Sequence, residues 1–128
     1  MAGGALLSLT FAFSAAAQGA IPSGQAIILW EIVWERVEGG TTQAVLRFIA
    51  PGIARDTGSI DAAAAMADID WLCATHAVPL ALLPAARAET YVVTIMDRAV
   101  ARGEADAEAT QYFGIYAITD GKCSPEDF

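Results

Sequence analysis

Residues 25–50 carry the pattern of a β-hairpin. The stretch 25–37 is rich in Ile, Val and Trp, and 41–50 is a second β-rich run that ends before a Pro-Gly pair. Between them, a Glu-Gly-Gly sequence at 38–40 favours a tight turn. Two antiparallel strands are therefore predicted.

The register of these strands follows from the same pattern, because a one-residue slip would move every side chain to the other face. A two-residue turn would oppose Ile32 to Arg47, whereas a three-residue loop gives one wholly apolar face and one cross-strand ion pair. We therefore predict the three-residue loop, with the apolar face under a helix and Arg47 left unburied. The apolar pairs are Trp34–Ala44, Ile32–Leu46, Trp30–Phe48 and Ile28–Ala50, and the pairs on the second face are Val33–Val45, Glu31–Arg47 and Leu29–Ile49.

Residues 61–76 show the clearest helical period in the chain. Ser59 or Asp61 can cap the start of this helix, and Pro79 lies just beyond its end. A buried stripe is predicted from side chains that recur at intervals of three and four, namely Ala62, Ala65, Met66, Ile69, Leu72, Cys73 and His76.

The rest of the chain predicts two more strands and a second, short helix. In order, the pattern predicts a loop at 77–88 that can include a turn of helix, a strand at 90–96, a polar turn at 97–104, a short helix starting at Asp106 or Ala107 and ending at Phe113, and a strand at 114–119. The order β-β-α-β-α-β predicts an α+β fold, with a mainly antiparallel four-stranded sheet and one long helix on one face.

The first 17 residues resemble a secretory signal peptide. Residues 5–13 are apolar apart from a serine and a threonine, and three alanines follow at 15–17. This stretch is too short to span about 30 Å of hydrocarbon. We expect cleavage after Ala17, one domain at 18–128, and a periplasmic or secreted location; a buried N-terminal helix is the alternative.

The charge of the chain narrows the range of partners. Its formal net charge is −8, none of it in residues 1–17, and its pI is about 4.3. Such a surface repels phosphate backbones and anionic lipid. We therefore expect no nucleic-acid partner and no stable membrane insertion after leader removal.

Cys73 and Cys123 are the two cysteines of the chain. An even count in an oxidising compartment favours a disulfide between them. Closing a loop of about 50 residues would stabilise the fold by roughly 4 kcal/mol. Two unpaired buried thiols are the alternative.

Three sequence blocks and the two cysteines carry a family resemblance. Residues 46–55, 96–98 and 109–113 resemble a family of small exported alphaproteobacterial proteins described as a domain of unknown function. The resemblance implies export and a shared architecture but no activity. An acetolactate-synthase label found on some such proteins has no support here, because 111 residues have no room for a thiamine-diphosphate enzyme. Cys123-Ser124-Pro125 departs from the expected Cys-apolar-Trp pattern, which leaves the role of the tail open.

Asp56 begins the tetrapeptide Asp-Thr-Gly-Ser, which is also the motif of aspartic proteases. In that class two carboxylates about 3 Å apart share one proton, so a chain with one motif would act as a dimer. The expected apolar strand does not precede Asp56, and an alanine-rich helix follows it. A dimeric hydrolase using Asp56 is therefore the alternative to a loop and helix cap.

His76 is the single histidine and lies three residues after Cys73. The two could form half of a metal site, but no second ligand pair follows, and a structural role is expected. Glu104, Asp106 and Glu108 lack the loop glycine and distal glutamate of a calcium loop. No cofactor or metal is predicted.

Arg55, Asp97 and Arg98 follow predicted strands. The two arginines could clamp a carboxylate or phosphate through their planar donor groups, although surface ion pairs explain them as well.

The second face of the hairpin presents Val33, Val45 and Ile49, which form a possible partner face. Segment 77–88 or a partner protein could cover it. The sequence therefore favours an exported, non-enzymatic binding or accessory module that contacts a protein or a small anionic ligand.

Overall fold

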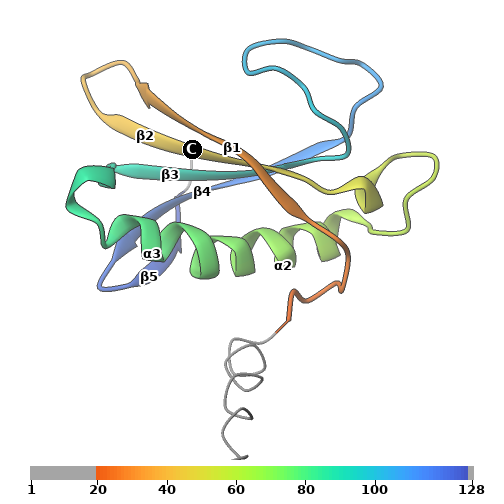
Figure 1. Cartoon of the computed structure of the whole chain (residues 1–128), viewed down its shortest axis with the longest axis horizontal. Coiled ribbons are helices and arrows are strands. Elements are labelled where there is room, and N and C mark those ends of the chain that lie inside the picture. The colour runs from red at the N-terminus through yellow and green to blue at the C-terminus, as the bar shows by residue number, and fades with distance from the viewer. Residues whose placement is uncertain (1–19, 127–128) are drawn as a thin grey trace, which may run out of the picture.

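The computed structural model describes residues 20–126, so the predicted leader and its cleavage site lie outside the described residues. Five strands form one sheet in the order β1-β2-β3-β4-β5. Figure 1 shows a helix along one face of the sheet and a loop rising from the opposite face. The strands are β1 (Ile28–Arg36), β2 (Thr42–Ile49), β3 (Thr90–Met96), β4 (Gln111–Thr119) and β5 (Lys122–Pro125).

The hairpin of β1 and β2 has the predicted register over most of its length. The pairs Glu31–Arg47, Ile32–Leu46, Val33–Val45 and Trp34–Ala44 are those expected. In the turn, Gly39 and Gly40 have φ of 90° and 86°, a conformation that glycine adopts without steric cost. The pattern of side chains therefore selected the correct loop length.

A bulge in β1 makes the predicted register wrong before Glu31. The register shifts between Leu29 and Glu31, so that Leu29 opposes Phe48 and Ile28 opposes Ile49. Bulges place an extra residue in one strand and reorient its side chain. Here the ring of Trp30 lies 5.2 Å from the Arg47 guanidinium, on the second face and away from the helix.

The predicted helix is confirmed but continues past residue 76. α2 spans Ala62–Leu72, a π-helical turn follows at Cys73–Ala77, and α3 spans Val78–Ala81. The predicted loop at 77–88 does contain a turn of helix, α3, but this turn continues the long helix without a break, because Pro79 occupies the first turn of α3, where a proline is tolerated. A short 3-10 turn at Pro84–Ala86 precedes β3.

The sheet is mixed rather than mainly antiparallel. β2 and β3 pair in parallel, while the other neighbouring strands are antiparallel. The helix between β2 and β3 returns the chain along the sheet, so both strands start at the same end. A long crossover connection of this kind, rather than a tight turn, is what parallel neighbours require.

The prediction of a second helix ending at Phe113 is wrong, because β4 already begins at Gln111. Tyr112, Phe113, Ile115 and Tyr116 are aromatic or β-branched residues that favour strands. A helix of about seven residues would have been marginal without tertiary packing. The unpredicted fifth strand follows a turn in which Asp120 and Gly121 have φ of 52° and 74°.

The main core lies between the helix and the sheet. Its largest fully buried side chains include Phe48, Leu46, Ile69, Leu72, Tyr91 and Ile95. Gly114 is needed for close packing, since a Cβ there would lie 2.8 Å from Tyr116 Oη and 3.0 Å from Ile69 Cγ2. The Tyr116 hydroxyl donates to Asp70 at 2.5 Å, and burial raises the pKa of Tyr116 above its ordinary value.

The predicted disulfide joins Cys73, in the π-helical turn, to Cys123 in β5. It therefore ties the last edge strand to the helix. No helix within residues 20–126 combines the length and the apolar character needed to cross a membrane.

Candidate functional site

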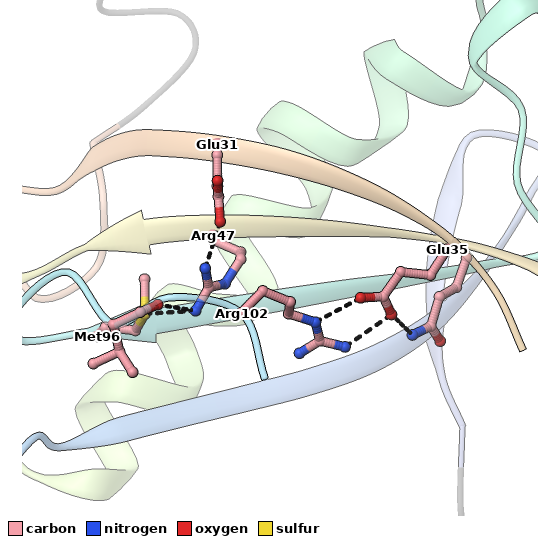
Figure 2. A network of polar contacts seen from close by, with 7 residues as sticks. Glu31, Glu35, Arg47, Met96 and Arg102 are labelled. Atoms are coloured by element: carbon pink, nitrogen blue, oxygen red, sulfur yellow. Dashed lines mark hydrogen bonds and ion pairs between the residues drawn. The ribbon is translucent and has the colours of Figure 1, made fainter. Parts of the chain in front are cut away.

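A polar network occupies the face of the sheet opposite the helix. Arg47 is only 3% exposed, which contradicts the expectation that it would stay unburied. Figure 2 shows its guanidinium between Glu31 and the strand end at Met96; it pairs with Glu31 and donates to Val100 O at 2.5 Å and to Met96 Sδ at 3.3 Å. These partners make the buried charge tolerable, since an unpaired buried charge would be costly.

Glu35, farther along β1, anchors the loop at 97–110, which also contains Val100. Arg102 donates to its two carboxylate oxygens at 2.7 and 2.9 Å, and the Gln43 side chain donates at 2.8 Å. The hydrogen bond from Arg102 is the main reason that the pKa of Glu35 is lowered to about 2, and burial opposes this shift. Arg47 and Arg102 thus fasten the first half of the loop at 97–110 to the sheet.

This loop, and not segment 77–88, covers the second face. Val45 of the predicted partner face is fully buried, while Val33 and Ile49 are partly buried. Val100 of the loop is also buried, beside Arg47. The middle of the face is therefore filled by the protein's own chain, and Val45 is not accessible to a partner in this conformation.

An exposed apolar surface lies instead along β1. This strand forms one edge of the sheet and leaves large side chains in solvent: Ile28 is 64% exposed, Leu29 43%, Trp30 42% and Trp34 49%. The other edge, β5, has four residues and ends at Pro125. A long apolar edge is unusual because its free backbone groups can pair with another chain.

The backbone of β1 offers a short ladder of free groups. Val37 N–H donates to Thr41 O at 2.8 Å, so the backbone groups of Val37 point toward β2. Backbone groups alternate in direction along an antiparallel strand. Arg36, Trp34 and Ile32 therefore direct their N–H and C=O groups away from β2.

The two arginines predicted to clamp an anion, Arg55 and Arg98, lie close together at the end of the sheet nearest the 3-10 turn Pro51–Ile53. Arg55 and Arg98 line a pocket of about 380 Å³ with Asp56 and Glu108. Arg55 donates to the carbonyl oxygens of residues 107 and 109 at 3.4 and 3.2 Å. Its guanidinium therefore already holds the loop that covers the second face.

Arg98 is similarly engaged. Its Nε lies 2.9 Å from Asp97 Oδ2, and Asp97 also accepts from Thr110 N–H at 2.7 Å. Burial alone would raise the pKa of Asp97, but the Thr110 and Arg98 bonds outweigh it and lower that pKa. Two carboxylates, those of Asp56 and Glu108, thus line this pocket with the two arginines, and a third, Asp97, pairs with Arg98. This arrangement favours closure of the loop over capture of an anion.

Asp56 lies in an exposed turn and has no side-chain hydrogen bond within residues 20–126. The glycine of its motif has a local explanation: a Cβ on Gly58 would lie 2.2 Å from Gly52 O and 2.6 Å from Ala54 O. Gly58 N–H donates to the same Ala54 carbonyl at 2.8 Å. The tetrapeptide therefore closes a compact loop before α2.

Asp68 is a buried polar residue that the sequence pattern missed, because the helical period placed Met66 in the core instead. Asp68 is fully buried, whereas Met66 is 37% exposed. Its carboxylate accepts from Ser23 N at 2.9 Å, Ser23 Oγ at 2.5 Å and Gln25 Nε2 at 2.8 Å. It thereby fastens the segment 20–27 to the side of α2.

The Cys73 and His76 pair does not form a metal site, since Cys73 is in the disulfide. Among the residues that the structure describes, no group of three or more His, Cys, Asp and Glu side chains is placed to hold a metal ion.

Fold and site together define a class of protein: an α+β chain whose mixed five-stranded sheet is covered by a helix on one face and by an ion-paired loop on the other. The chain belongs to the family of unknown function DUF6497, whose model matches residues 6–128. This agrees with the resemblance to a domain of unknown function. No curated protein and no solved structure matches the chain significantly.

Proposed function

We propose that this protein is an exported binding module that recognises a partner protein by pairing its β1 edge with an extended segment of that partner. The observation that carries the proposal is the long apolar edge, on which Trp30 and Trp34 are 42% and 49% exposed. Strand addition uses such edges: backbone bonds supply affinity, and alternate side chains supply specificity.

Two features support the edge over the sheet face as the binding surface. The middle of the second face is filled by the protein's own loop, which buries Val45. The bulge at Trp30 interrupts the regular ladder, so the segment able to pair is confined to residues 32–36. A partner segment of about five residues is therefore expected.

Export is part of the proposal and rests on the apolar pattern of residues 1–17 and on the disulfide, which is typical of oxidising compartments. The same compartment would contain the partner. The acidic chain, with its net charge of −8, makes a nucleic-acid partner unsuitable.

The test uses a photo-cross-linking phenylalanine in place of Arg36, in cells of the native host. A discrete adduct heavier than the chain is expected, and Trp34→Pro in the same chain should abolish it. This proline removes an N–H that points away from β2, so the β1–β2 ladder is kept. Circular dichroism checks that the variant is folded.

The matched control carries the cross-linker in place of Phe113, which is 58% exposed on another strand. It should give no such adduct. The proposal fails if position 36 gives no adduct, or if folded Trp34→Pro gives the same adduct as the unchanged edge.

A further inference from the structure

A small cavity lies between segment 20–27, the start of β1 and the end of α2, away from the edge residues 32–36. Its volume is about 180 Å³, and Gln25 and His76 are its polar lining residues. A dry cavity of about 150 Å³ is enough to bind benzene in another protein. The apolar lining consists of Ile21, Ile27, Leu29, Phe48, Trp71 and Leu72.

The walls of this cavity are held in place. The Asp68 carboxylate holds Ser23 and Gln25, so segment 20–27 is fixed against α2. On the opposite wall, the ring of His76 meets Phe48 edge-on, with centroids 5.2 Å apart and planes at 82°. The cavity is therefore built from groups with defined contacts, as ligand sites usually are.

The hydrogen bonds of Thr75 determine which nitrogen of His76 carries the proton. The single hydroxyl proton of Thr75 is donated to Trp71 O at 2.8 Å. Thr75 Oγ1 lies 3.0 Å from His76 Nδ1, so the ring must donate this bond through Nδ1–H. Nε2 is then an acceptor, and it makes no hydrogen bond to any residue from 20 to 126. Burial lowers the pKa of His76, which favours this neutral form.

We infer that this cavity binds a small uncharged aromatic molecule that carries one hydroxyl group, with the ring among the apolar side chains and the hydroxyl donating to His76 Nε2. A charged ligand is disfavoured, because none of the lining residues that the structure describes offers a free counter-charge. The Asp68 carboxylate nearby is already occupied by three donors. This site is independent of the proposed strand pairing, so either can fail without the other.

The test compares phenol with toluene on the full chain, since the two have the same number of heavy atoms and only phenol can donate. Phenol should bind about 3- to 10-fold more tightly, the factor that corresponds to one net hydrogen bond. Because the chain has a single histidine, its ring ¹⁵N signals need no assignment by mutation. The Nε2 signal should move with phenol and stay unchanged with toluene.

Variants separate the hydrogen bond from the shape of the cavity. His76→Phe keeps a ring against Phe48 but should reduce the phenol-to-toluene ratio to about 1, and Thr75→Val should lower the ratio because Nδ1–H loses its acceptor. Leu83→Ala is the control, since Leu83 is 56% exposed and does not line the cavity. Should His76→Phe not fold, Thr75→Val still decides the matter.

Two results would overturn the inference. One is equal affinity for phenol and toluene, or no saturable binding of either. The other is phenol binding that leaves the Nε2 signal unmoved and is unchanged in Thr75→Val.

Discussion

Trp30 and Trp34 stand four positions apart on β1, an interval that would place them on the same face of a regular strand. Trp34 opposes Ala44 above the helix, whereas Trp30 lies over Arg47 on the other face. The bulge beside Trp30 causes the difference. Arg47 is thereby enclosed by Trp30, Glu31 and the loop at 97–110. Its side chain is shielded from solvent, and its charge has partners there.

Burial predicts different costs for two aromatic residues of the hairpin. Phe48→Ala should lower the free energy of unfolding by about 3–5 kcal/mol, because Phe48 is 1% exposed in the core. Trp34→Ala should cost only about 1–2 kcal/mol, because roughly half of that ring is already in solvent. Urea denaturation of the two variants checks this order, and a larger loss for Trp34→Ala would contradict the packing described.

Glu35 should make part of the stability depend on pH. Its pKa is about 2 in the folded protein, against an ordinary value of 4.5, so its contribution is present above pH 4.5 and is lost as the pH falls toward 2. Because the pair with Arg102 is partly exposed, the contribution should be below about 1 kcal/mol. The measurement is the unfolding free energy of wild type and Glu35→Gln at pH 7 and at pH 2.5.

The difference between the two proteins should be largest at pH 7 and clearly smaller at pH 2.5, because Glu35 is then protonated in the unfolded chain but still partly charged in the folded protein. A difference that grows on acidification would show that Glu35 acts through something other than its ion pair.

At the scale of elements, the helix and the last strand depend on each other. The π-helical turn Cys73–Ala77 contains the cysteine that reaches β5, and α3 begins directly after it. β5 has only four residues and one neighbouring strand. Such a short edge strand has few hydrogen bonds of its own, so the disulfide is its main tether.

Cys123→Ala should lower the free energy of unfolding by about 2–4 kcal/mol, since it opens a loop with a sequence separation of 50. Amide exchange should accelerate first in residues 122–125. Denaturation without reductant measures the loss, and wild type treated with reductant should match the variant. A wild-type protein whose stability is unaffected by reductant would contradict this role.

On the scale of the whole molecule, the sheet lies between a helix and a loop (Figure 1). The helix buries one face through apolar side chains, while the loop at 97–110 covers the other through Val100 and the Arg102–Glu35 pair. The Arg47–Glu31 pair of the strands lies beneath this loop. Four exposed large apolar residues then remain side by side along β1, namely Ile28, Leu29, Trp30 and Trp34. The proposed partner would therefore bind at the β1 edge, and the proposed ligand would bind in the small cavity at His76.

The local pattern alone determined the hairpin and its register beyond the bulge, the strand at 90–96, the start of the helix at Asp61 and the choice of Cys73 and Cys123 as the disulfide pair. Each of these depends on side-chain periodicity, on a cap within one turn or on a count of two cysteines.

Only the tertiary structure decided the parallel pairing of β2 with β3, the bulge at Trp30, the burial of Arg47 and Asp68, and the cavity at His76. The sequence shows arginine and aspartate as solvent-seeking residues, because their burial is favourable only when distant donors and acceptors surround them. Those partners, Val100 for Arg47 and Ser23 for Asp68, lie 53 and 45 positions away. Local periodicity contains no information about contacts at that separation, which is why folding of the whole chain was needed to create them.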